Sequence, residues 1–108
     1  MNATDWTKTR LNKAGQIVLT KKELASLPPL YAQDGKGKNA IAYVHFFTTG
    51  GYDFWATEFD PEQGIFFGKA RLFETELGYA DVQEFISTGI VERDLYWTPK
   101  PLTDCGND

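Results

Sequence analysis

The sequence lacks the residues from which several kinds of site are built. It has one cysteine among 108 residues, Cys105, which lies in a polar tail. One cysteine excludes an internal disulfide and any metal site made of several cysteines. The longest apolar run, residues 40–47, is far shorter than the roughly 20 residues of a membrane-spanning helix. We therefore predict no metal, no cofactor and no contact with a membrane.

Signals for export and for phosphate binding are also missing. The first residues lack a basic stretch followed by an apolar one, so we expect a cytoplasmic protein. Gly50 and Gly51 join two predicted strands instead of opening a helix, which excludes a phosphate-binding loop. There is no internal repeat.

A catalytic set is hard to assemble. The only histidine is His45, in the middle of a predicted strand, while Ser26 and Ser87 fall on predicted helices. A serine or cysteine nucleophile needs that histidine beside it, so we predict no catalytic residue. A hydrolase centred on His45 and Glu58 is the hypothesis that we rank last.

The composition is sufficient for one packed domain, since 42% of the residues are hydrophobic and 15% are aromatic. We predict a flexible basic arm over residues 1–15, a single domain over 16–102 and a disordered acidic tail over 103–108. Residues 1–50 hold seven Lys or Arg against three Asp or Glu, and residues 51–108 hold four against twelve. The halves therefore carry +4 and −8. These charges can simply solvate exposed faces and the tail, or they can form an acidic surface that competes for a nucleic-acid-binding partner or a basic arm that touches an acidic one.

Two short helices are predicted from their ends. Thr20 and Glu23 have the spacing of a capping box, and Pro28 stops the chain, which gives a helix over about 21–27. Asp81 can cap a second helix that Gly89 ends in the left-handed conformation.

Strands alternate with turns in the middle of the chain. Residues 40–48, 52–59 and 65–73 are rich in β-branched and aromatic side chains and are separated by turn sequences, and residues 91–98 form a further strand. The prediction is an α+β fold in the order α-β-β-β-α-β, with a short antiparallel four-stranded sheet and both helices packed on one face.

Simple hairpin register places Phe46 opposite Phe54 and Ala56 opposite Gly68. One face then collects apolar side chains, broken by Glu58 alone: Ala42, Val44, Phe46, Phe54, Ala56, Phe66, Gly68, Ala70 and Leu72. We expect the helices to cover this face, and a bulge would change the assignment of a strand.

The opposite face is half apolar and half charged. It holds Ile41, Tyr43, His45, Phe47, Trp55, Thr57, Phe67, Lys69 and Arg71. Such a face can bind a protein partner or a second copy, because Tyr, Trp and Arg favour interfaces. It can also stack single-stranded nucleic acid, or be covered by residues 17–19 and by loops. The candidate binding residues are Tyr43, His45, Trp55, Lys69 and Arg71.

Charges at the start of the last strand indicate a structural contact. Glu92, Arg93 and Asp94 alternate in sign, and Arg93 is expected to bridge to Glu58 or Glu74. We predict a structural ion pair between Glu58 and Arg93.

Several short motifs together resemble a known family. They are Leu27-Pro28-Pro29-Leu30-Tyr31, Ile41-Ala42-Tyr43-Val44, Phe46-Phe47-Thr48, Trp55-Ala56-Thr57-Glu58-Phe59-Asp60-Pro61, Phe66-Phe67-Gly68, Glu76-Leu77-Gly78-Tyr79 and Val91-Glu92-Arg93-Asp94-Leu95. In this order they resemble the bacterial family called domain of unknown function twenty-nine fifty-eight. The resemblance implies a bacterial or phage protein, often carried on plasmids and other mobile elements, and implies no reaction. Where that family has Ser before the second helix, this chain has Ala80-Asp81, and Asp81 caps equally well.

The function expected from the sequence is that of a non-enzymatic accessory protein of a mobile element or phage, which binds a protein partner or forms a homodimer. The alternative is binding of single-stranded nucleic acid through the aromatic and basic face.

Overall fold

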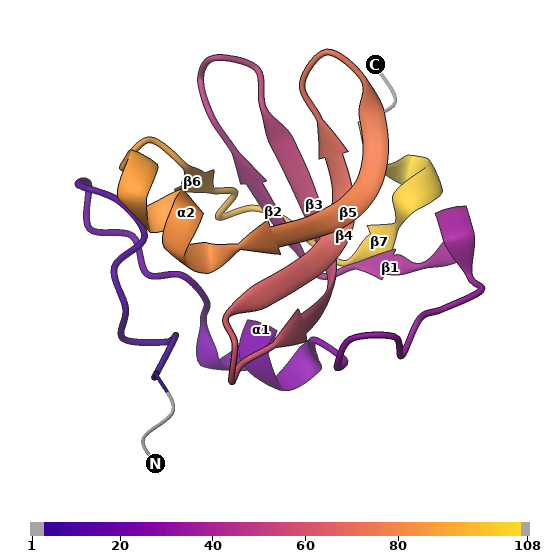
Figure 1. The fold of residues 1–108 in the computed structure, drawn as a ribbon, viewed down its shortest axis with the longest axis horizontal. Helices are drawn as coiled ribbons and strands as arrows, with labels where there is room; N and C mark the ends of the chain where they lie inside the picture. The colour runs from indigo at the N-terminus through magenta and orange to yellow at the C-terminus, as the bar shows by residue number, and fades with distance from the viewer. Residues whose placement is uncertain (1–3, 107–108) are drawn as a thin grey trace.

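A five-stranded antiparallel sheet organises the chain in the computed structural model, which describes residues 4–106. The spatial order of the strands is β5-β4-β3-β2-β6. Their bounds are β2 Val44–Phe47, β3 Asp53–Asp60, β4 Ile65–Arg71, β5 Thr75–Asp81 and β6 Glu92–Arg93. A second sheet pairs β1 (Ile41–Ala42) with β7 (Lys100–Pro101). Figure 1 shows the β2–β3 and β4–β5 hairpins rising beyond the rest of the fold.

The helices begin and end where their capping residues predict. In α1 (Lys21–Ser26) the Thr20 hydroxyl accepts from the Glu23 amide, and the Glu23 carboxylate accepts from the Thr20 amide. In α2 (Val82–Thr88) Asp81 caps the Gln83 amide, and Gly89 ends the helix with φ of 70°. Single 3₁₀ turns occur at η1 (Gly37–Asn39) and η2 (Leu102–Asp104).

Both helical segments contribute side chains to the same apolar cluster. Leu24 of α1 and Leu27 just after it, with Val82 and Phe85 of α2, join the larger apolar cluster. Its other strand members are Val44, Phe46, Phe54, Ala56, Phe59 and Phe66. Burial of these rings supplies most of the stability of a chain this size.

The predicted register holds as far as Ala56 and then shifts. Phe46 lies opposite Phe54 and Ala56 opposite Gly68, as expected. A β-bulge between Ala56 and Glu58 then sets Glu58 opposite Phe67 and Phe59 opposite Phe66. The bulge moves the carboxylate out of the apolar core and turns the Phe59 ring into it, 4.4 Å from the Phe66 ring centre.

The mixed helix and antiparallel sheet architecture is confirmed, but the single four-stranded sheet is wrong. The structure adds β5, whose polar and glycine residues alternate too little in hydropathy to predict a strand. The predicted strand over 91–98 contributes only β6, since the chain turns away at Asp94. Between β1 and β2 the chain also changes sheet, so Ala42 packs with Trp55 in a second cluster instead of with Phe46.

The expected N-terminal arm differs from the structure over residues 4–15. Trp6 is 3% exposed and packs edge-on against Phe59, and its indole N–H donates to the Pro61 carbonyl at 2.8 Å. Leu11 is buried in the same cluster. This segment packs on the domain because two large apolar side chains lie among its charges; residues 1–3 lie outside the described residues.

The expected acidic tail also has structure where the chain is described. Leu102 and Cys105 are buried, and η2 packs beside η1. Residues 107–108 lie outside the described part. Within residues 4–106, no helix has the length and apolar character needed to cross a membrane.

Candidate functional site

Four of the five predicted binding residues come together on one face of the sheet. The His45 ring stacks on Trp55 with 5.1 Å between ring centres and 6° between planes. Lys69 Nζ and the Arg71 guanidinium carbon lie 5.3 Å and 5.1 Å from the Trp55 ring centre. Adjacent strands bring them together, because Trp55 lies opposite both His45 and Lys69. Cations this close to an indole ring are attracted by its π face.

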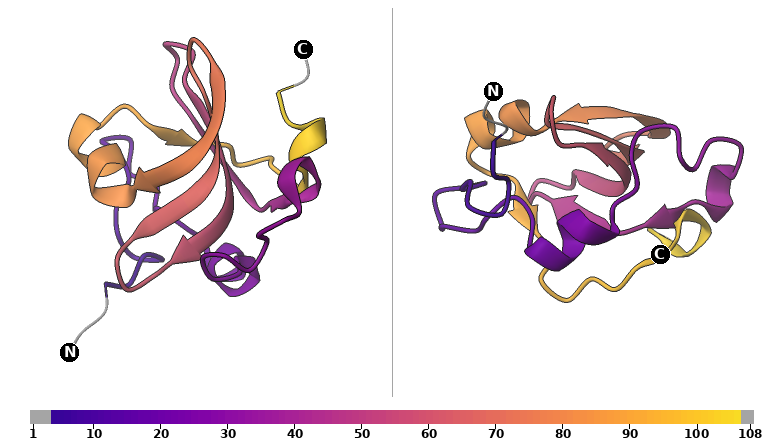
Figure 2. Two further views of the ribbon diagram at one scale, coloured as in Figure 1. Left: turned by 45° about the vertical axis from the view of Figure 1, so that its right-hand side comes forward. Right: turned by 90° about the horizontal axis from the view of Figure 1, so that it is seen from below.

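This face is covered by the end of the chain, and Trp55 is only 2% exposed. Lys69 Nζ donates to the Cys105 carbonyl at 2.9 Å, and Arg71 donates to the Gly106 carbonyl at 2.7 Å. A side chain at Gly106 would lie 2.8 Å from the Trp55 ring, so only glycine lets the backbone approach. The cover expected from residues 17–19 is wrong, since Val18 and Leu19 pack on the opposite face. Figure 2 shows the C-terminal segment and α2 on opposite sides of the sheet.

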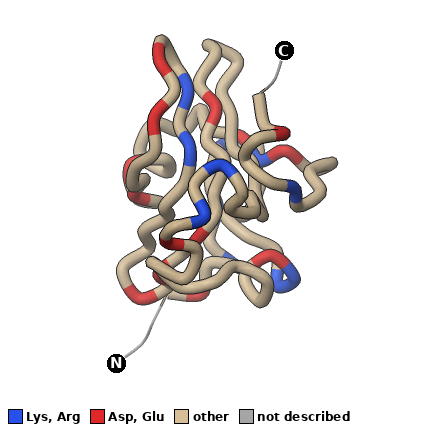
Figure 3. The backbone as a smooth tube through the Cα atoms, turned by 90° about the vertical axis from the view of Figure 1, so that its right-hand side faces the viewer, with Lys and Arg blue, Asp and Glu red and all other residues tan. Residues whose placement is uncertain are grey.

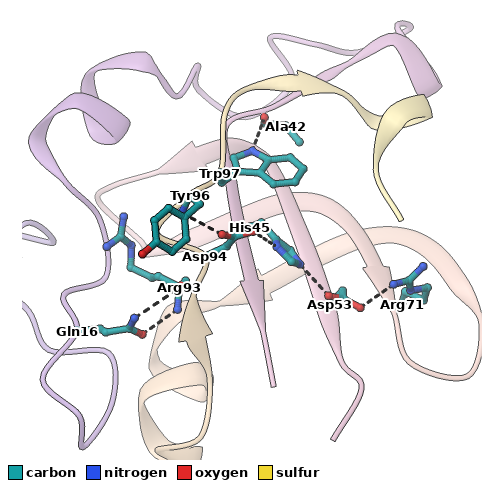
Figure 4. Close-up of polar contacts among 9 residues, drawn as sticks. All are labelled: Gln16, Ala42, His45, Asp53, Arg71, Arg93, Asp94, Tyr96 and Trp97. Atoms are coloured by element: carbon teal, nitrogen blue, oxygen red, sulfur yellow. Dashed lines mark hydrogen bonds and ion pairs between the residues drawn. The ribbon is translucent and has the colours of Figure 1, made fainter. Parts of the chain in front are cut away.

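His45 is the centre of a polar network on the same face of the sheet (Figure 4). Its Nε2 lies 2.8 Å from Asp53 and its Nδ1 lies 3.0 Å from Asp94. Asp53 also accepts from Arg71 at 2.9 Å. Because an ionised carboxylate only accepts, a ring nitrogen must carry a hydrogen to donate to it. With both nitrogens engaged, the network links β2, β3 and β4 to the chain after β6.

Sequence reasoning missed Asp53, Asp94 and Trp97 as members of this network. Trp97 lies 5.3 Å from the His45 ring, and its indole N–H donates to the Ala42 carbonyl. Asp53 was detectable, since it lies two residues from Trp55 on the same side of the same strand. Asp94 and Trp97 follow β6 in a loop, where alternation gives no signal.

The remaining predicted residues are placed differently. Tyr43 leaves the Trp55 face and packs against the larger cluster, because the chain changes sheet between β1 and β2. Arg93 is buried but pairs with Glu23 of α1 at 2.6 Å. Glu58, 3% exposed, accepts instead from the backbone amides of Tyr31 and Gln33 at 2.8 and 2.7 Å. The predicted Glu58–Arg93 pair is therefore wrong. Glu58 contacts backbone amides, and Arg93 contacts Glu23.

An open groove lies on the other face of the sheet, between α2 and the projecting hairpins. It consists of two hollows of about 480 and 420 Å³ that share Tyr52 and Leu72 in their walls. We call it the acidic groove, since its charged lining residues are all carboxylates: Glu74, Glu76, Asp81 and Glu84. Burial and the nearby Glu84 raise the pKa of Tyr52 to about 12, so its phenol stays neutral in the groove.

The backbone groups at the two edges of the sheet differ in their hydrogen-bond partners. At the β6 edge, the Gln16 side-chain amide bonds the backbone N–H and C=O of Arg93 at 2.9 and 3.3 Å, and Asn12 donates to the Val91 carbonyl. Figure 4 shows Gln16 in this position. At the other edge, the outer side of β5 pairs with no strand of residues 4–106. One edge is therefore occupied by side-chain amides and the other offers a free backbone.

Among the described residues, no three His, Cys, Asp or Glu side chains form a group that could hold a metal ion. Comparisons with protein-family models, with curated proteins and with solved structures found no match to the chain. The resemblance to the uncharacterised bacterial family therefore stays a prediction.

Proposed function

We propose that the protein is a non-enzymatic protein-interaction module that binds a strand of its partner along the edge of β5. The observation that carries this proposal is the seven-residue length of that edge, which is exposed along most of its course. Long open edges add strands from other chains unless charge, proline or a cover prevents it.

The direction of the backbone groups along β5 follows from the hydrogen bonds at its two ends. The Val82 amide donates to the Gly64 carbonyl, and the Leu72 amide donates to the Glu74 carbonyl. Both contacts keep the register in which Leu77 lies opposite Lys69. Since hydrogen-bonded pairs alternate in an antiparallel ladder, the amides of Leu77 and Tyr79 point to the open edge.

Side chains beside this edge fit an apolar strand. Leu77 and Tyr79 are about half exposed on the same face of β5, and the Tyr79 hydroxyl lies 3.5 Å from that of Tyr31. Alternate side chains of an added strand would bury against this row. A second copy of the chain is one possible partner strand, and the mobile-element setting implied by the resemblance stays a prediction.

Nucleic-acid binding is not our proposal. That alternative needs Trp55 as a stacking platform, and the Trp55 ring lies beneath Cys105 and Gly106.

A proline in β5 tests strand addition. Leu77→Pro removes an outward amide and leaves the β4 ladder intact, so the folded variant should lose its partner. Partners are captured from a lysate of the source organism, and self-association is measured by sedimentation.

Leu77→Thr is the matched control, because it keeps the amide and removes the apolar side chain. Amide exchange at Leu77 and Tyr79 should slow when the captured partner is added. Equal capture by folded Leu77→Pro and wild type would contradict the proposal.

A further inference from the structure

The acidic groove is a surface of the sheet that no segment of residues 4–106 covers. α2 covers the part of the sheet near Phe46 and Phe54 through Phe85, whose ring lies 5.3 and 6.0 Å from theirs. The hairpins extend beyond α2, as Figure 1 shows. Each hollow falls within the range of about 300–1,000 Å³ that is typical of ligand pockets.

The walls of the groove are apolar and accessible. Phe85 and Tyr52 form an edge-to-face pair at its base, 6.2 Å between ring centres. Leu72 and Ile90 line it with more than half of their surface exposed, and Phe73 at its end is 95% exposed. Exposed apolar side chains gathered in this way mark interaction sites.

The charged residues that line the groove all have the same sign. Glu74 and Glu76 lie at the hairpin end, and Asp81 and Glu84 lie at the α2 end. In Figure 3, acidic positions follow the left side of the tube, the side that carries the β4–β5 hairpin and α2. Anionic ligands, including nucleic acids and acidic lipid surfaces, are repelled there, whereas Lys and Arg are attracted.

We infer that the acidic groove binds a cationic amphipathic segment of another protein. Its apolar side chains enter the two hollows on either side of Tyr52 and Leu72, and its Lys or Arg residues pair with the four rim carboxylates. A metal ion or a small cation would leave the apolar walls exposed, so the chemistry of the whole lining fits a peptide segment.

This inference goes beyond strand addition and does not depend on it. Strand addition uses the backbone edge of β5, whereas the groove uses side chains such as Glu76, Leu72 and Glu84. The two can therefore fail separately.

A designed peptide tests the inference. A fluorescein-labelled amphipathic peptide of Leu and Lys should bind the wild-type protein and raise its own fluorescence anisotropy. Peptides with Glu in place of Lys, or Ser in place of Leu, should bind at least about tenfold more weakly, which is about 1.4 kcal/mol. Strong binding of the Glu peptide would overturn the inference.

Protein variants separate the groove from net charge. Glu76→Lys with Glu84→Lys should weaken binding of the Leu-Lys peptide by about tenfold or more. The control, Asp34→Lys with Glu62→Lys, makes the same charge change at exposed positions outside the groove and should change affinity by less than about threefold. An equal loss in both pairs would show that only net charge attracts the peptide, and absence of wild-type binding would also overturn the inference. Retained peptide binding by Leu77→Pro would show that the groove acts without the β5 edge.

Discussion

The two faces of the five-stranded sheet differ in how far the chain covers them. On one face, Trp55, Lys69 and Arg71 lie beneath residues 102–106, and carbonyl groups of that segment satisfy both cations. On the other face, α2 covers the sheet near Phe46 and leaves the acidic groove open. The residues that look most like a binding site in the sequence thus stabilise the fold, while the surface open to a partner contains none of the five candidate binding residues.

The two faces differ in whether their polar groups have partners within the protein or are in contact with solvent. The Trp55 face contains an imidazole, two carboxylates and two cations, which are costly to bury unless each finds a partner, and the network supplies those partners. The groove contains carboxylates that remain in contact with solvent, so no segment of the described chain is needed to neutralise them.

The largest expected effect is on stability, and it separates the part of the face that α2 covers from the open groove. Phe85→Ala should lower the free energy of unfolding by about 3–4 kcal/mol, because it removes a buried ring from the contact between α2 and the sheet. Leu72→Ala, in the open groove, should change it by about 0.5 kcal/mol or less. Urea denaturation with an unchanged m-value measures both. Similar losses in the two variants would mean that the groove closes in solution.

A smaller effect is expected at the cover of Trp55. Leu102→Ala should cost about 2–3 kcal/mol, whereas Leu95→Ala, at an exposed position, should cost about 0.5 kcal/mol or less. Burial also raises the pKa of the Cys105 thiol, so a thiol reagent should label the native protein slowly. Leu102→Ala should speed labelling by about tenfold or more. Labelling of the wild type as fast as of the denatured chain would show that the segment does not cover Trp55 in solution.

The smallest effect concerns Tyr52 in the groove. Its pKa is about 12 in the folded protein and about 10 in the unfolded chain, so the folded state holds the phenol proton more tightly. The resulting stabilisation is complete below pH 10 and is lost as the pH rises from about 10 to about 12. Tyr52→Phe should therefore lose less stability over this range than the wild type. Urea denaturation across the range measures the difference.

The control for Tyr52 is Tyr96→Phe, because Tyr96 is almost fully exposed. This variant should follow the wild-type dependence on pH. If Tyr52→Phe also follows it, the Tyr52 phenol is not shielded in the groove.

Local chemistry explains why some elements could be predicted. Thr20, Glu23 and Asp81 act on amides two or three residues away, so the ends of both helices follow from short stretches of sequence. The turn at residues 49–51 likewise sets the register that places Phe46 opposite Phe54.

Other features depend on contacts between distant residues. The bulge before Glu58 is favoured because its carboxylate reaches two amides about 25 residues earlier in the chain, beyond the range of any periodic pattern. The strand β5 forms beside β4 with little alternation of its own, and Trp6 finds Phe59 across more than 50 residues. Alternation along the strands groups His45, Trp55, Lys69 and Arg71 on one face. It does not show that residues 102–106 cover three of them, Trp55, Lys69 and Arg71.

The sequence by itself determined the two capped helices and the pairing of side chains along the central hairpins as far as Ala56, because these depend on interactions within a few residues. The tertiary structure alone decided which face of the sheet is covered, which edge is capped and which carboxylates gather around a groove. Those outcomes depend on where residues 4–19 and 102–106 pack on the sheet. Contacts between residues far apart in the sequence decide that packing.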